Sequence, residues 1–600
     1  MAEESNEAGR SKGVLRTSIL SVRARRPEAM KVSPKLPRMP AASPQLIALQ
    51  QRAQAALARR DWPAAEEALG AMLRIDPQQP RVWLALGDVQ EHLQNWPSAE
   101  ACWRQAAERA PQLAEAHYHR ARALRALGYA ELALASLNTA LQIQPRDANA
   151  LQLRAMLEEE RGDLPAALAT LDAALQLAPG RAALHHNRAV ALHRSERHAE
   201  SLAAHERAQA LGLDAADAHY NHGNTLQALG RAADAKAAYR QALQRAPQHA
   251  LALYDLARLR WALGEEEDFC AELEAAERAD PQSPLATGIR AQLLLKAGRA
   301  QAAAEAYQRA TALSAEASGY WDGLGQALGL LGRHAESLDA HARALALAPQ
   351  DVNVRCNAAH SMLAAGRAEQ AAVQAEAACQ MAPENQQAWA LLGLAWRMLD
   401  DPREPWLNDY QRFVRVFDLP LPAGFNELLS AELQALHTDR EAPIDQTLRR
   451  GTQTRGNLLD QPHAQVQALK AELSAAIDRY VAELPADKPH PFLGRNTGRW
   501  HYVASWSSRL RSQGFHTNHV HTLGWISACY YVAVPPAVEQ GHAGWIKFGE
   551  PDMDLKLLPQ RLEQPRPGRL LLFPSCMWHG TVPFEDAAQR LTIAFDLRPV

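Results

Sequence analysis

Three histidines and one arginine near the C-terminus have the types and the spacing of a metal site. His519 and His521 are two residues apart, His579 follows about 58 residues after His521, and Arg590 lies a further eleven residues on. Residues i and i+2 of a β-strand point to the same face, so a strand would direct the first two imidazoles toward one ion. Two adjacent ligands, a third from a late strand and a downstream arginine are typical of a facial metal site, which leaves half of an octahedral iron open.

The region that must position these residues predicts β-structure. From about residue 496 the chain forms short runs rich in Val, Ile, Tyr, Trp and Phe, separated by Gly, Pro and Asp. Two helices are expected before it, at about 425–437 and 463–484, separated by a polar loop at 449–456. Seven or so short strands in about 105 residues predict a barrel or a sandwich. The expected strands are 498–507, 515–521, 525–534, 544–549, 569–573, 579–583 and 590–597.

The first four hundred residues contain a repeat. Prolines recur at intervals of 34 residues or twice 34, at Pro77, Pro111, Pro145, Pro179, Pro247, Pro281, Pro349 and Pro383. A period of 34 is that of the tetratricopeptide repeat, and the unit that ends at Pro111 shows its pattern most fully, with Trp83, Gly87, Ala99 and Trp103. This region therefore resembles the tetratricopeptide-repeat family. The resemblance implies about ten helix pairs, each pair ending before its proline, stacked into a superhelix with an extended concave surface.

These patterns divide the chain into three parts. We expect a disordered leader at residues 1–42, which are basic and rich in Pro, Ser and Arg, and a repeat solenoid with a divergent cap at 43–403. The third part, 404–600, has its metal-site core at 496–600. The expected fold is thus multidomain: an all-α superhelix followed by a mainly-β domain with flanking helices.

Composition narrows the classes of partner and the compartment. Apolar residues make up 47% of the 600 residues and the formal net charge is −3, which gives no electrostatic reason to expect nucleic acid or an anionic membrane as the partner. The six cysteines include no CxxC pair, a pattern typical of free thiols in a reducing compartment. The sequence contains no apolar run of the roughly 20 residues that span a bilayer. We therefore expect a cytoplasmic protein.

Three segments of residues 404–600 carry a further resemblance. They are 519–532, which begins His-Val-His-Thr-Leu-Gly-Trp, 567–579, which ends Phe-Pro-Ser-Cys-Met-Trp-His, and 590–595, Arg-Leu-Thr-Ile-Ala-Phe. Together they resemble the 2-oxoglutarate/iron(II) oxygenase family of prolyl-hydroxylase type, which is often fused to tetratricopeptide repeats. The resemblance implies a double-stranded β-helix (jelly roll), with Fe(II) as cofactor and 2-oxoglutarate as cosubstrate.

The same resemblance implies roles for individual residues. His519 and His579 match the iron ligands, and His521 stands where the wider superfamily has an aspartate. Arg590 would bind the distal carboxylate of 2-oxoglutarate through its planar guanidinium. Tyr531 would donate a hydrogen bond to that same carboxylate. The expected catalytic group is therefore the three histidines with Arg590.

The third histidine leaves alternatives open. Two histidines and a carboxylate give iron(II) one negative protein charge, whereas three histidines give none. The site would be a neutral three-histidine iron centre, or it would take a carboxylate from elsewhere, such as Glu550 or Asp552. Alternatively it would prefer zinc, since three histidines and a water also describe a catalytic zinc site.

Three other polar residues lie near the histidines in the sequence. Arg509, His516 and Asn518 are candidates to line the pocket. His516 is three residues before His519, so on a continuous strand it should point to the opposite face.

The expected function is oxidation by a 2-oxoglutarate-dependent dioxygenase of the hydroxylase type. The solenoid would capture a protein or peptide substrate on its concave face, an expectation that rests on architecture. Two alternatives remain: a repeat scaffold with a non-catalytic barrel, and a metal-dependent enzyme, such as a zinc hydrolase or a cupin-like dioxygenase, that does not use 2-oxoglutarate.

Overall fold

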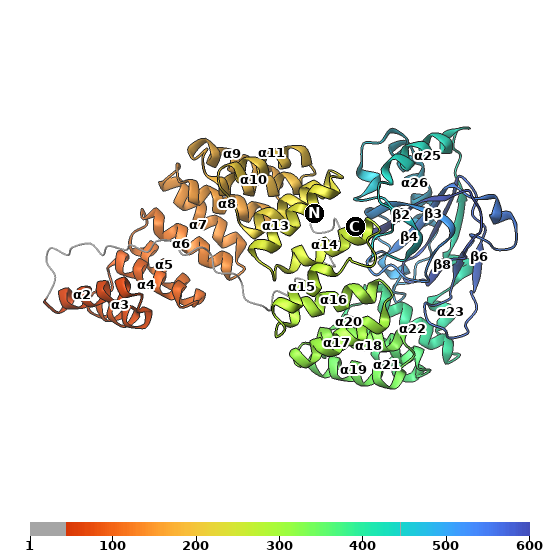
Figure 1. The fold of residues 1–600 in the computed structure, drawn as a ribbon, viewed down its shortest axis with the longest axis horizontal. Coiled ribbons are helices and arrows are strands. Elements are labelled where there is room, and N and C mark those ends of the chain that lie inside the picture. The colour runs from red at the N-terminus through yellow and green to blue at the C-terminus, as the bar shows by residue number, and fades with distance from the viewer. Residues whose placement is uncertain (1–43, 445) are drawn as a thin grey trace. The chain divides into compact units, whose positions relative to one another are not determined.

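A computed structural model describes residues 44–444 and 446–600, so the leader expected at residues 1–42 lies outside the described residues (Figure 1). The described chain divides into two compact units, with the boundary between residues 242 and 243. The first contains helices only. The second contains further helices and all of the described strands.

Six helix pairs form the first unit. In most of the pairs the second helix ends shortly before the periodic proline: α3 ends at Ile75 and α5 at Arg109, ahead of Pro77 and Pro111. Side-chain caps begin several of these helices, as Asp61 does by accepting a hydrogen bond from the amide of Ala64. The helices are α2 Pro44–Arg59, α3 Trp62–Ile75, α4 Pro80–His92, α5 Trp96–Arg109, α6 Ala114–Ala126, α7 Ala130–Ile143, α8 Ala148–Glu160, α9 Leu164–Leu177, α10 Ala182–Arg194, α11 His198–Ala210, α12 Ala216–Ala228 and α13 Ala232–Arg245.

Four more helix pairs open the second unit, which makes the ten pairs that the 34-residue period predicts. They are followed by α22 and by two short helices. The bounds are α14 Ala250–Ala262, α15 Ala271–Ala279, α16 Pro284–Lys296, α17 Ala300–Leu313, α18 Ser318–Leu330, α19 His334–Leu347, α20 Val352–Ala364, α21 Ala368–Met381, α22 Gln386–Met398, α23 Glu404–Leu407 and α24 Tyr410–Phe413.

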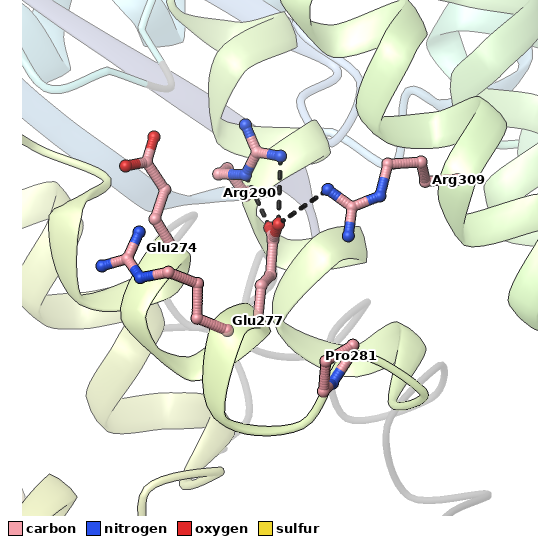
Figure 2. Close-up of a pocket in the computed structure, with 6 residues that line it drawn as sticks. Glu274, Glu277, Pro281, Arg290 and Arg309 are labelled. Atoms are coloured by element: carbon pink, nitrogen blue, oxygen red, sulfur yellow. Dashed lines mark hydrogen bonds and ion pairs between the residues drawn. The ribbon is translucent and has the colours of Figure 1, made fainter.

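Ion pairs bind neighbouring repeats of this unit together. Glu277 of α15, 7% exposed, accepts hydrogen bonds from Arg290 of α16 at 2.6 and 3.1 Å and from Arg309 of α17 at 3.3 Å (Figure 2). A buried carboxylate needs such partners to offset its lost hydration. Three of the side chains that line the small cavity beside them, Glu277, Arg290 and Arg309, therefore already bind one another.

Two antiparallel sheets form the jelly-roll domain. The larger has the strand order β1-β7-β4-β9-β3-β2 and the smaller β6-β5-β8. The strands are β1 Arg415–Asp418, β2 Leu448–Gln453, β3 Trp500–His516, β4 Ile526–Ala533, β5 Ile546–Phe548, β6 Arg561–Glu563, β7 Arg569–Pro574, β8 His579–Thr581 and β9 Arg590–Pro599.

Two helices flank the larger sheet, α25 Phe425–Leu436 and α26 Ala464–Glu483 (Figure 1). Both were predicted from the sequence, within one residue at each end. Leu433 of α25 and Ile477 of α26 are fully buried in one hydrophobic core with Tyr530 of β4 and Ile593 of β9. These helices therefore cover the sheet that carries Arg590.

The structure corrects three expectations about the strands. The segment 515–521 is not a strand of its own, because β3 ends at His516 and the following residues form a loop. The polar stretch at 449–456, expected as a loop, contains most of β2, which pairs with β3. In addition, β1 pairs with β7, so the larger sheet begins well before residue 496.

Candidate metal centre

A backbone bridge, rather than a shared strand, brings the histidines together. His519 lies in the loop after β3, and its amide and carbonyl exchange hydrogen bonds with those of His579, at 2.8 and 3.0 Å. His579 is the first residue of β8. The amide of His521 is bonded to the carbonyl of Ser575 at 3.0 Å. Backbone hydrogen bonds between distant segments of the chain therefore fix the main chain at all three histidines.

The three rings meet at one point. The ring centroids of His519 and His579 are 4.2 Å apart, and each centroid is 5.1 Å from that of His521. One ligand nitrogen from each ring lies within 4.8 Å of the others. Among the described residues, this is the one group of at least three His, Cys, Asp or Glu side chains that meets this condition.

Each imidazole is held through its Nδ1 atom. Nδ1 of His519 lies 2.7 Å from the carbonyl of Thr517, and Nδ1 of His579 lies 3.0 Å from the carbonyl of Met577. Nδ1 of His521 contacts both carboxylate oxygens of Asp596, at 2.7 and 2.8 Å. Carbonyls and carboxylates only accept hydrogen bonds, so Nδ1 must carry the proton in every ring. In the neutral rings Nε2 is therefore the nitrogen that carries a lone pair.

Two of these lone pairs face each other. Nε2 of His519 and Nε2 of His521 are 3.2 Å apart. Burial lowers the pKa of His519 to about 3, with a further contribution from His521, and burial beside His519 lowers that of His579 well below its usual range. Protonation of His519 and of His579 is thus disfavoured near neutral pH. Two nitrogens bound to one ion at about 2.1 Å lie about 3.0–3.4 Å apart, so the donor set fits a metal ion.

The carboxylates proposed as alternative ligands are engaged elsewhere. Asp552 pairs with His360 at 2.9 Å, and Glu550 pairs with Lys547 at 2.8 Å. Asp596, 3% exposed, is the carboxylate that contacts the site, behind His521. Sequence reasoning missed Asp596. The sequence held a signal for Asp596: it lies an even number of residues after Arg590 on the same predicted strand. Residues 590, 592, 594 and 596 of a strand point to the same face.

Arg590 and Tyr531 lie side by side in the domain interior. Arg590 is 2% exposed, its Nη2 lies 3.4 Å from the Tyr531 hydroxyl, and its guanidinium sits 5.1 Å from the centre of the tyrosine ring. Its Nε and Nη1 atoms are buried without a hydrogen-bond partner, as is the hydroxyl of Ser508. Ser508 pairs with Thr592 on β9, so its side chain shares the face of Arg590.

Of the polar residues expected near the pocket, Arg509 points away from the site and His516 lies close to it. Arg509 pairs with Leu591, so it projects from the face of β3 opposite to Arg590, where its charge lowers the pKa of His437 in addition to the effect of burial. His516, expected to point away from the site, instead lies with its ring centroid 6.2 Å from that of His519. The chain leaves the strand conformation after His516, so the alternation of faces does not continue to His519.

Comparisons with protein families identify both parts of the chain. Residues 56–112, and residues 93–148, 220–284 and 290–352, match two tetratricopeptide-repeat families. Residues 504–596 match the family described as "Putative 2OG-Fe(II) oxygenase". The chain carries tetratricopeptide repeats and, at its C-terminus, a "Putative 2OG-Fe(II) oxygenase" domain. The oxygenase domain thus contains the three histidines, Arg590 and Asp596.

Solved structures similar to this chain include yeast Tom70, at 14% identity over 61% of this chain and 99% of that chain, with a TM-score of 0.36. The MamA RS-1 ArsTM double mutant is 19% identical, over 28% of this chain and 96% of its own, with a TM-score of 0.28. TTC0263, a thermophilic repeat protein of Thermus thermophilus, is 25% identical over 28% and 93%, with a TM-score of 0.26. No curated protein matches the sequence.

None of the described helices combines the length and the apolar character that crossing a bilayer requires.

Proposed function

We propose that the oxygenase domain is a 2-oxoglutarate- and Fe(II)-dependent dioxygenase that hydroxylates its substrate. His519, His521 and His579 would hold the iron. The observation that carries the proposal is the convergence of one nitrogen from each of the three rings within 4.8 Å of one another, with Nδ1 of each ring beside an acceptor. When the rings are neutral, the Nε2 atoms of His519 and His521, 3.2 Å apart, repel each other unless a cation lies between them, and imidazole nitrogen is a ligand that suits iron.

The guanidinium of Arg590 fits the cosubstrate. A buried cation with two unpartnered N–H groups is costly unless an anion completes its hydrogen bonds. In the described part of the chain no carboxylate pairs with it. One carboxylate of 2-oxoglutarate would accept from the guanidinium of Arg590, with the hydroxyls of Tyr531 and Ser508 as further partners. This arrangement supports 2-oxoglutarate over a metal enzyme that needs no acidic cosubstrate.

When bound, iron would supply the activation of dioxygen, with one oxygen atom entering a substrate C–H bond and the other entering succinate as 2-oxoglutarate loses carbon dioxide. The residues of the protein orient the three histidines and surround them with packed side chains. Asp596 fixes the orientation of His521, and the ring of Trp506 stacks on that imidazole at 5.8 Å. The rings of Phe573 and Phe548 pack against His579, at 4.7 and 6.3 Å, and exclude water from that side.

The repeats would bind the substrate and hold it for the oxygenase domain. Stacked helix pairs present an extended concave surface of the kind that binds peptides in an extended or helical form. We therefore propose that the oxygenase domain acts on a protein or peptide that the repeat solenoid of the same chain holds. The substrate proposal rests on architecture, whereas the cofactor proposal rests on the site.

Succinate formation from 2-oxoglutarate tests the proposal. The chain is loaded anaerobically with Fe(II) and then exposed to oxygen with 2-oxoglutarate, with and without peptide libraries. Wild type should form succinate, and His579→Ala and Arg590→Ala should not. Equal turnover in wild type and both variants would overturn the site assignment. Zinc loading is the control, because a redox-inert ion cannot support this reaction; hydrolysis of peptides by the zinc form would favour a hydrolase instead.

A further inference from the structure

We infer that the last repeats form part of the metal centre, and that His360 of α20 is a positioning residue for the ligand His519. The inference rests on the proposed function, because it concerns the same ion. Residues 549–558, which join β5 to β6 and which we call the strap, make the connection. The strap, α20 and α22 all belong to the second unit.

Helix α22 holds both ends of the strap. The guanidinium of Arg397 donates from Nη1 to the carbonyl of Gly549 and from Nη2 to the carbonyl of Leu558, the latter at 2.8 Å. Between these points Met553, Leu555 and Leu557 pack against a hydrophobic cluster that α20, α21 and α22 form together with Leu407, Cys576 and Trp578. Arg397 therefore ties both ends of the strap to the repeats, and the three apolar side chains pack on the cluster that the repeats help to form.

His360 fixes the middle of the strap. Its Nε2 lies 2.9 Å from Oδ1 of Asp552, and their side chains are 30% and 40% exposed. An ion pair this exposed contributes little to overall stability. Its effect is positional, because the carbonyl of the preceding residue, Pro551, accepts a hydrogen bond from Nδ2 of Asn518 at 2.8 Å.

Asn518 transmits that position to the ligands. It immediately precedes His519, and it packs so closely on Gly580 that a Cβ added there would lie 2.2 Å from Oδ1 of Asn518. Gly580 in turn follows His579, whose backbone is bonded to that of His519. A displacement of Pro551 would therefore move both ligand backbones, since the contact leaves no free space.

Two further contacts tie the ligands to the same helices. Trp578, the residue before His579, donates from its indole to the carbonyl of Ala390 in α22 at 3.3 Å, and its own carbonyl accepts from the amide of Gly549 at 2.8 Å. Val520, between His519 and His521, packs against the same hydrophobic cluster. Each ligand thus has a chain neighbour in contact with the repeats, with the strap or with that cluster.

Cobalt affinity of the full-length chain tests the role of His360. Co²⁺ is titrated anaerobically and followed by calorimetry and by its visible absorption. We expect His360→Leu to weaken Co²⁺ binding about fivefold and to change the spectrum, since couplings of this kind are modest. His360→Gln should bind within about twofold of wild type, because the amide nitrogen of Gln reaches the position of imidazole Nε2. Asp552→Asn combined with His360→Leu should weaken binding no more than His360→Leu alone.

His334→Leu is the matched control, a similarly half-buried histidine of α19 in the same unit, and it should leave Co²⁺ affinity unchanged. Thermal unfolding of every variant checks that the fold persists. Wild-type affinity in a folded His360→Leu chain would overturn this inference and leave the proposed function intact. A wild-type chain that binds no Co²⁺ would overturn the proposed function and this inference with it.

Discussion

His521 donates from Nδ1 to the carboxylate of Asp596, with the two oxygens at 2.7 and 2.8 Å. Asp596 also accepts from the Ser527 hydroxyl at 2.6 Å, which fixes its orientation. A carboxylate behind a histidine ligand raises the basicity of the imidazole. The negative charge that the three histidines lack is therefore placed directly behind one of them.

Asp596→Asn should weaken metal binding by about 10–100-fold, since an amide keeps the shape but loses the charge and can turn its N–H₂ toward His521. Equilibrium dialysis against Fe(II) or Co²⁺ measures the change. Asp418→Asn is the matched control, because it removes an exposed ion pair with Arg569 in the same sheet. Equal metal affinity in the two variants would show that Asp596 does not support the ligand.

Arg590→Met should abolish stabilisation by 2-oxoglutarate without lowering the melting temperature of the cosubstrate-free protein. The guanidinium is buried and two of its nitrogens lack partners, so an apolar side chain removes a desolvation penalty. A ligand at about 100 times its Kd stabilises the folded state by about 2.7 kcal/mol, which thermal melts of the metal-loaded wild type should detect.

Arg415→Met controls for that experiment, because it removes an exposed ion pair with Glu483 and should keep the response to 2-oxoglutarate. A large fall in the melting temperature of cosubstrate-free Arg590→Met would contradict the account, since it would make Arg590 a structural residue.

Gly87→Ala and Gly70→Ala should shift stability in opposite directions. A Cβ at Gly87 would lie 2.4–2.8 Å from atoms of the Trp103 ring, which is fully buried, so the added methyl overpacks the repeat and should cost about 1–3 kcal/mol. At Gly70, within α3, the nearest atom is 3.7 Å away at the flexible end of Arg74, so alanine should stabilise by about 0.5–1 kcal/mol. Denaturant midpoints of the full chain measure both, and a destabilised Gly70→Ala or a neutral Gly87→Ala would refute this packing.

Much of the fold was predictable because it follows local rules. The 34-residue proline period fixed the helix pairs, since proline at the same place in each unit ends a helix by the same mechanism. The helices α25 and α26 were visible as amphipathic segments. The strands β4, β7 and β9 were visible as apolar runs, because they are buried in the domain core.

The rest depends on contacts between distant residues. β2 contains Arg449 and Arg450, which have no local preference for a strand, and it forms because it pairs with β3. The loop at His519 is set by its bridge to His579, so a rule based on alternating strand faces placed His516 wrongly. The role of the strap is invisible in the sequence, because Arg397 and His360 belong to helices more than 150 residues before its contacts.

Metal content after anaerobic loading tests the central claim most directly. Full-length wild type and four single alanine variants, at His519, His521, His579 and His516, are loaded with Fe(II), desalted and assayed by elemental analysis and native mass spectrometry. Wild type and His516→Ala should retain one ion per chain, because His516 is near the site but outside the ligand group. The other three should retain less than about a tenth of that, given the 10–100-fold losses that even outer partners produce. Retention of a full ion by a folded His579→Ala chain would contradict the claim that the three imidazoles bind one metal.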